Sequence, residues 1–204
     1  MSRLIAPSRE SLAEAPTEPV FRLSIEQYED MIQYGIIDED DPVELIDGWL
    51  LIKMSKSTNH THSTRHTRRE IERVLPAGWF ADSQEPVQLV RSRPEPDVVV
   101  HRGETDGTLP NPPAANGIAL LVEVADNSLA RDRGSKKRVY AEAGIACYWL
   151  INLVDHLVEV FTDPSGPADK PDYAHSQVYS RGSAVPLVLE GREVARLNVT
   201  SLLP

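Results

Sequence analysis

The sequence has a single cysteine, Cys147, so no disulfide can form within the chain. It stands in the apolar run IACYWLI, which favours burial as a small hydrophobic side chain. No apolar run approaches the roughly 20 residues that a membrane-spanning helix needs. Residues 1–19 also lack the apolar core of a secretory signal. We therefore expect a cytoplasmic protein that makes no membrane contact.

Positive charge is scarce as well, because 21 Lys and Arg residues face 31 Asp and Glu residues, for a net charge of −10. This balance argues against a protein that coats nucleic acid without specificity. Residues 1–47 hold 12 acids and 3 bases, which accounts for most of the excess. The other bases cluster in residues 56–73 and 131–138. Such clusters are usually solvated faces, but beside a carboxylate site they could hold phosphates.

The sequence shows no internal repeat, no base-reading motif and no sign of a second domain. His62 and His66 are four residues apart, but Ser63 follows His62, so the HExxH zinc pattern is absent. Residues 1–19 are polar and contain three prolines, which predicts a flexible N-terminal tail. We expect residues 20–204 to form one domain with a substantial core.

Short helices and strands alternate along residues 20–204. Ser24 and Gln27 fit a capping box for a helix that ends near Gly35, and Asp47-Gly48 predicts a hairpin turn. Further helices are predicted at 60–75 and 132–143. A strand or strand pair is predicted at 79–90. Single strands are predicted at 95–101, 118–125, 147–153, 156–162, 173–179, 185–189 and 194–199. The nearly continuous apolar run 118–125 is typical of a central strand, and the tail strands should complete a mixed sheet.

Three acids, Glu44, Asp97 and Glu123, stand at predicted strand positions. Glu123 lies in an apolar run, and a carboxylate taken out of water costs several kcal/mol unless it finds a cation or hydrogen-bond donors. Strand pairing could bring Asp97 beside it, and two adjacent buried carboxylates repel unless a cation separates them. Each acid alone could be an ordinary strand-end charge. Together they fit oxygen ligation of a hard cation such as Mg²⁺.

Lys136 opens the helix that follows Glu123. The helical face that carries Val139, Tyr140 and Ala143 also carries Lys136, because the spacings are three, four and seven residues. This predicts that Lys136 is turned inward and that Lys137 points elsewhere. A surface lysine with its stem on apolar side chains is the alternative. An inward ammonium could orient an attacking water and stabilise charge on a phosphate.

Glu44, Pro96-Asp97, Glu123-Val124 and Lys136 resemble the PD-(D/E)xK nuclease superfamily. Within it, the segments VELIDG, EPDVVV, LVEVADNSLARDRGSKKRVYAEAGI and YWLINL resemble the "putative restriction endonuclease" domain family, over roughly residues 20–180. The resemblance implies an α/β (α+β) fold: a restriction-endonuclease-like mixed β-sheet core flanked by helices, with extra antiparallel strands.

The resemblance also implies Mg²⁺-dependent phosphodiester hydrolysis, with Mn²⁺ as a substitute ion. Asp97, Glu123 and the Val124 carbonyl would be metal ligands, and Glu44 would be an accessory acid that positions metal or water. Lys136 would be the catalytic lysine.

Two positions need separate treatment. The superfamily usually has a lysine where Ala125 stands, so here the lysine must come from the next helix, as Lys136 or Lys137; the predicted facing favours Lys136. His60 matches a histidine common in the family and would contact phosphate or shuttle a proton. It could equally be a surface histidine at a helix start.

The sequence therefore supports two functions. The first is a metal-dependent endonuclease acting on DNA, active as a homodimer whose twofold axis matches that of the duplex. RNA cleavage would use the same residues. The alternative is a catalytically inactive nuclease fold kept as a binding or assembly module, which the overall acidity and the shifted lysine would suit.

Overall fold

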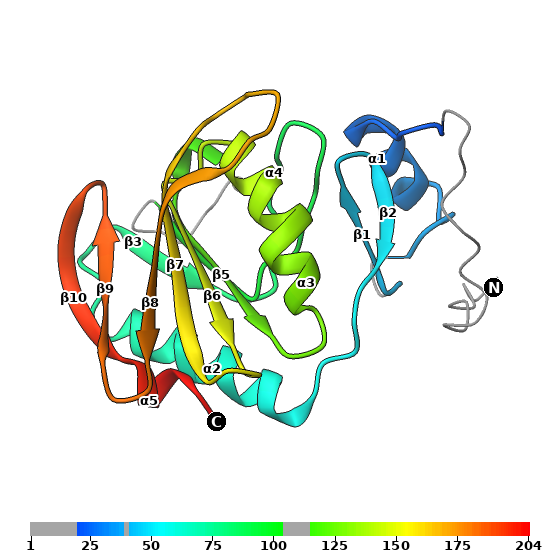
Figure 1. Cartoon of the computed structure of the whole chain (residues 1–204). Coiled ribbons are helices and arrows are strands. Elements are labelled where there is room, and N and C mark those ends of the chain that lie inside the picture. Colours follow the sequence, from blue (N-terminus) through cyan, green and yellow to red (C-terminus); the bar gives the residue numbers. More distant parts are fainter. Residues whose placement is uncertain (1–19, 39–40, 104–114) are drawn as a thin grey trace.

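The computed structural model describes residues 20–38, 41–103 and 115–204. Its centre is a six-stranded mixed sheet with strand order β3-β4-β5-β6-β7-β8 (Figure 1). The strands are β3 (Trp79–Asp82), β4 (Val98–Arg102), β5 (Ile118–Ala125), β6 (Cys147–Asn152), β7 (Leu157–Pro164) and β8 (Tyr173–Ser180). β5 and β6 pair in parallel, and the other neighbours pair antiparallel. The predicted tail, residues 1–19, lies outside the described residues.

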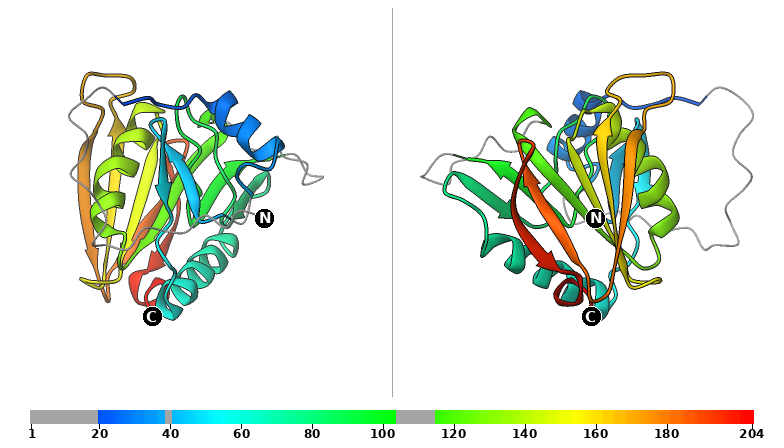
Figure 2. Two further views of the ribbon diagram at one scale, coloured as in Figure 1. Left: turned by 90° about the vertical axis from the view of Figure 1, so that its right-hand side faces the viewer. Right: turned by 60° about the vertical axis from the view of Figure 1, so that its left-hand side comes forward.

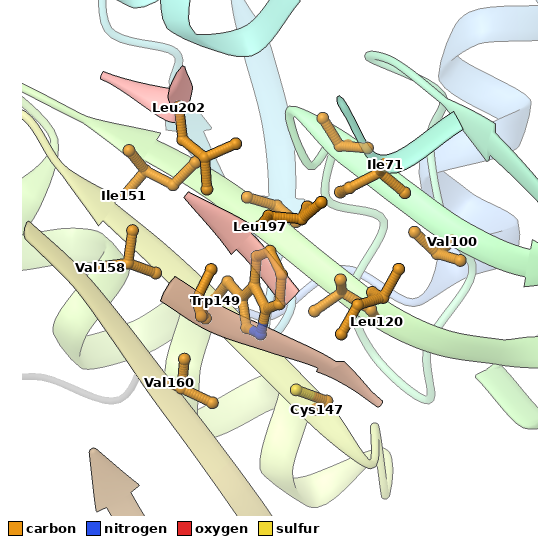
Figure 3. Packing of buried hydrophobic residues seen from close by; sticks show 14 of the residues in the cluster. Ile71, Val100, Leu120, Cys147, Trp149, Ile151, Val158, Val160, Leu197 and Leu202 are labelled. Atoms are coloured by element: carbon orange, nitrogen blue, oxygen red, sulfur yellow. The ribbon is translucent and has the colours of Figure 1, made fainter. Parts of the chain in front are cut away.

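Helices cover both faces of this sheet. One face carries α2 (Thr58–Glu72) and α5 (Val199–Leu202), and the other carries α3 (Leu129–Arg131), the π-helical turn η3 (Asp132–Lys136) and α4 (Lys137–Glu142) (Figure 2). All eight residues of β5 are buried, as predicted for a central strand covered on both sides. In the core on the face that carries α2 and α5, Trp149 lies wholly buried among Ile71, Leu120 and Leu197 (Figure 3).

The N-terminal part lies beside the main sheet and consists of α1 (Ile25–Gln33) and the hairpin β1 (Val43–Ile46) and β2 (Trp49–Ile52). The predicted capping box is present, with Ser24 and Gln27 each accepting the other's backbone N–H. The predicted hairpin turn is also present. Asp47 has φ 50° and Gly48 φ 79°, the positive values of a type I′ turn. This turn returns the chain so that β2 pairs with β1 in a separate two-stranded sheet.

Four predicted elements differ from the structure. The tail strands β9 (Ala184–Leu189) and β10 (Arg192–Asn198) do not complete the main sheet but pair with each other as a separate hairpin, which packs on the core that α2 and α5 also cover. The strand or strand pair predicted at 79–90 is a single strand that ends at Asp82. The segment after it contains Pro86, which has no N–H to donate to a ladder. The helix predicted at 132–143 begins at Leu129 and contains the π turn.

No described helix combines the length and the apolar character that crossing a bilayer requires.

Candidate active site

Strand pairing brings two of the predicted acids together. Val98 of β4 lies opposite Val122 of β5, so Asp97, one residue earlier, comes beside Glu123. The Val124 N–H donates a hydrogen bond of 2.8 Å to Asp97 Oδ2. Asp97 and Glu123 are 4% and 3% exposed, so both carboxyls are withdrawn from water. Register alone therefore creates the pair of buried acids that the sequence suggested.

Lys136 supplies the cation beside these acids. Its Nζ lies 2.8 Å from Glu123 Oε1 and 3.2 Å from Glu44 Oε2, and the side chain is buried. Glu44 reaches this point from β1 and is also 3.4 Å from the Arg131 guanidinium. Lys137 points away and pairs with Asp172 at 2.8 Å. The structure thus has the facing that helical spacing predicted, with Lys136 inward.

His60 joins the same cluster from the first turn of α2. Its Nε2 lies 3.1 Å from Asp97 Oδ2, and the residue is 7% exposed, so it is not a surface histidine. Its Nδ1 is buried and makes no hydrogen bond within the described chain. A cavity of about 50 Å³ is lined by all the predicted residues: Glu44, His60, Asp97, Glu123, Val124 and Lys136. This volume has room for an ion or a few waters rather than for a nucleotide.

Two residues of this site were not predicted, namely Tyr140 and Asp132. The Tyr140 hydroxyl donates a 2.6 Å hydrogen bond to Glu123 Oε1. Asp132 lines the cavity, is 2% exposed, and accepts a hydrogen bond from Ser128. Ser128, Asp132, Lys136 and Tyr140 are spaced four residues apart in the sequence, but this spacing alone does not predict that all four face one site. In an α-helix each such step rotates by about 40°, so the set would not share one face. The wider π turn η3 changes this rotation between Asp132 and Lys136, so that both residues face the site.

The site is rich in carboxylates and poor in cations. Burial raises the pKa of Glu123 well above its ordinary value, the Lys136 ammonium opposes this, and neighbouring carboxylates add to it. Burial raises the pKa of Asp132 to about 6, against the effect of Lys136 and the Ser128 hydrogen bond. Burial alone would lower the pKa of Lys136, but Glu123, Glu44 and Asp132 outweigh it and raise that pKa. Lys136 is therefore charged, and the site favours a further positive charge.

The donor chemistry fits Mg²⁺. Magnesium prefers oxygen ligands, usually takes one or two carboxylates and keeps several waters. Asp97 and Glu123 can supply these carboxylates, with Glu44 nearby. The described residues nevertheless contain no cluster of three or more His, Cys, Asp or Glu side chains placed to hold a metal. In this structure Lys136 bridges Glu44 and Glu123, while His60 and the Val124 N–H contact Asp97. The full ligand set stays a prediction.

A family model named Uma2, with the description "Putative restriction endonuclease", matches residues 25–200. This chain belongs to the Uma2 family. The resemblance inferred from the sequence motifs is thereby confirmed. No curated protein matches this Uma2 chain.

A solved structure is similar to the Uma2 chain. It is the crystal structure described as a "putative nuclease belonging to DUF820" from Anabaena variabilis ATCC 29413. The TM-score is 0.68 at 16% sequence identity, over 88% of this chain and 97% of that chain. At this identity the likeness shows the fold alone. It confirms the predicted fold class, a mixed sheet flanked by helices.

Proposed function

We propose that this chain is a metal-dependent endonuclease that hydrolyses phosphodiester bonds in DNA. The observation that carries the proposal is that Glu44, Asp97, Glu123 and Lys136 line one cavity, where the Lys136 ammonium pairs with Glu44 and Glu123. Membership of the Uma2 family supports a nuclease. Cleavage within a chain needs carboxylates for a metal and a cation for the phosphate, and this cavity has both.

Asp97, Glu123 and the Val124 carbonyl would hold Mg²⁺, with Glu44 as the accessory acid and Mn²⁺ as a substitute ion. When bound, the ion would polarise a phosphoryl oxygen and lower the pKa of water. Neighbouring groups fix these carboxylates in place: the Val124 N–H and His60 contact Asp97, and the Tyr140 hydroxyl donates to Glu123. Such outer contacts orient ligands and keep them ready to bind.

Lys136 acts by its charge. Because the surrounding carboxylates raise its pKa, its Nζ stays an ammonium at neutral pH and cannot accept a proton. Its three N–H groups can donate to Glu123, to Glu44 and to a water or phosphate oxygen in the cavity. In a buried site such a fixed donor stabilises the charge that develops on the attacked phosphate. Lys136 therefore orients the water and stabilises the phosphate.

His60 is assigned to proton transfer or phosphate contact. Its contact with Asp97 fixes the ring through Nε2, and Nδ1 has no described partner. A ring held at one nitrogen can exchange a proton or a hydrogen bond at the other. The leaving oxygen of the cut strand needs a proton, and a histidine at the cavity wall is suited to relay it.

The test is cleavage of supercoiled plasmid by the purified chain with Mg²⁺ or Mn²⁺. We expect nicked or linear product from the wild type and at least about 100-fold slower cleavage by Asp97→Asn and Glu123→Gln. Glu193→Gln, an exposed acid on β10, is the matched control and should cleave normally. Cleavage that survives both site substitutions would contradict the assigned site. Failure of the wild type with both ions would contradict the function.

A second candidate is a nuclease fold that binds or assembles without catalysis. The observation in its favour is the bridge that Lys136 makes between Glu44 and Glu123, which occupies carboxylates a metal would use. Calorimetric titration with Mn²⁺ separates the two functions. Binding at millimolar concentration or tighter supports the enzyme, whereas a folded chain that binds no Mn²⁺ supports the module.

A further inference from the structure

The two basic clusters differ in their partners. Every base in residues 131–138 forms an ion pair with a described carboxylate: Arg131 with Glu44, Arg133 with Glu159, Lys136 with Glu123, Lys137 with Asp172 and Arg138 with Asp47. Apart from Lys136, which faces the cavity, the bases of this cluster are therefore not free to hold DNA phosphates, because carboxylates of the chain already pair with them.

The other cluster is largely unpaired. Most Lys and Arg side chains of the described chain pair with a carboxylate. Those with no ion pair to any described residue are Lys56, Arg65, Arg69, Lys170, Arg181 and Arg192. The first three belong to one stretch, residues 48–69, which contains no Asp or Glu in a chain that has 31 of them. Positive charge is thus concentrated here although the protein as a whole is strongly acidic.

These three cations share an exposed surface with polar neighbours. Arg65 and Arg69 are exposed and four residues apart, so they lie one turn apart on the same face of α2. Thr61 and His62 are exposed one turn before Arg65, and Lys56 is exposed just before the helix begins. We call Lys56, Thr61, His62, Arg65 and Arg69 the α2 face.

The α2 face adjoins the catalytic cavity. Lys56 lines that cavity and also a neighbouring hollow of about 330 Å³, which Thr61, His62 and Arg65 line as well. His60, on the buried side of the same helical turn, reaches Asp97. From this end α2 runs beneath the sheet toward β3 (Figures 1 and 2). The distance from Thr58 to Arg69 is about 16 Å at 1.5 Å per residue. DNA strands carry one phosphate per 3.4 Å of axis, so several phosphates fit this length.

We propose that the α2 face binds the sugar-phosphate backbone of the DNA on one side of the bond that is cut. The inference rests on the proposed endonuclease function and names the surface that holds its substrate. Arginine and lysine neutralise phosphates and position a duplex without reading its bases. The cavity itself is too small for more than the reacting group, so neighbouring phosphates must lie outside it, and the α2 face begins at its edge.

The experiment measures binding without cleavage. A fluorescent duplex oligonucleotide is titrated with protein in EDTA, and anisotropy is followed over a series of salt concentrations. The test variant is Lys56→Gln/Arg65→Gln/Arg69→Gln. The control is Lys170→Gln/Arg181→Gln/Arg192→Gln, which removes the same number of unpaired charges elsewhere. We expect the test variant to bind at least about 10-fold more weakly, with a slope of log K against log salt smaller by about 2 to 3, and the control to change by less than about twofold.

Each outcome decides something. Equal binding by the two variants overturns the α2 face, while plasmid cleavage by the wild type leaves the proposed function standing. A wild type that neither binds duplex nor cleaves plasmid overturns both. Unlabelled polyglutamate is compared with unlabelled DNA of equal charge as a competitor of the fluorescent duplex. If polyglutamate competes as strongly as the DNA does, the α2 face is assigned to acidic protein instead. Circular dichroism of both variants confirms that lost binding does not reflect unfolding.

Discussion

Glu123 meets two buried donors through a single oxygen, the Lys136 ammonium at 2.8 Å and the Tyr140 hydroxyl at 2.6 Å. At the scale of residues, this contact decides how stable the site is without metal. The Lys136 charge also reaches Glu44, so this cation compensates Glu123 and shares Glu44 with Arg131. A bound divalent ion would therefore neutralise some of the same carboxylate charge that the Lys136 ammonium neutralises.

Lys136→Met tests this overlap. Removing one partner of a buried ion pair leaves an uncompensated charge and costs about 3–5 kcal/mol of folding stability. We expect Mn²⁺ to raise the melting temperature of the variant more than that of the wild type, because the ion replaces the lost charge. Differential scanning calorimetry with and without Mn²⁺ measures this, and Lys137→Met is the control. An ion effect no larger in Lys136→Met than in the wild type would show that the carboxylates do not share a metal.

Asp132 makes the stability depend on pH. Burial raises its pKa to about 6 from an ordinary value of 3.8. Between these two values the folded chain binds a proton more tightly than the unfolded chain does. Stability from this group is therefore lost as the pH rises from about 4 through 6. At pH 7 the loss amounts to about 3 kcal/mol.

Asp132→Asn stays neutral at every pH. Relative to the wild type, we expect its free energy of unfolding to increase by up to about 3 kcal/mol between pH 4 and pH 7. Urea unfolding at several pH values gives the comparison. Asp163→Asn, at a side chain that is 68% exposed, should show no such trend. A difference between Asp132→Asn and the wild type that stays constant with pH would mean that Asp132 titrates normally in the folded chain.

At the scale of elements, the π turn η3 sets which residues of the helix after β5 face the cavity. Gly134 lies within it and has open space around it, so Gly134→Ala should preserve the turn. Deleting Gly134 should restore α-helical winding and rotate Asp132 by about 100° relative to Lys136. We expect the deletion to slow plasmid cleavage at least about 10-fold and Gly134→Ala to cleave normally. Equal activity of the two variants would show that η3 does not position the site.

Elements fixed by local chemistry were predicted well from the sequence. The capping box at Ser24, the turn at Asp47-Gly48 and the buried run 118–125 depend on neighbouring residues and match the structure. The separate hairpin β9–β10 was missed because alternating burial tells which face of a strand is apolar but not which strand it pairs with. The π turn was missed because long-range contacts support it, including the bond from the Tyr148 hydroxyl to the Asp132 carbonyl.

The candidate site was predictable to a similar extent. Lys136 is the last residue of the π turn, and regular α-helical spacing holds from Lys137 onward, so the facing argument from Val139, Tyr140 and Ala143 applied to it. Asp132 lies before that point, within the π turn, and the same argument could not reach it. Tyr140 was correctly placed on the core face, but its hydroxyl could be assigned to Glu123 only once the helix had been packed against β5.

One site of the proposed endonuclease could cut only one strand of a duplex at a time. Cutting both strands in a single binding event requires two cavities related by a twofold axis, as in a symmetric dimer. We therefore predict a homodimer, with a mass near twice 22.7 kDa by light scattering coupled to size-exclusion chromatography. Plasmid cleavage gives an independent measure, because a dimer should form linear product early whereas a monomer should first accumulate nicked circles. A monomeric mass at the concentration of the cleavage assay, together with nicked product alone, would contradict the dimer and leave a single-strand nicking activity for the same residues.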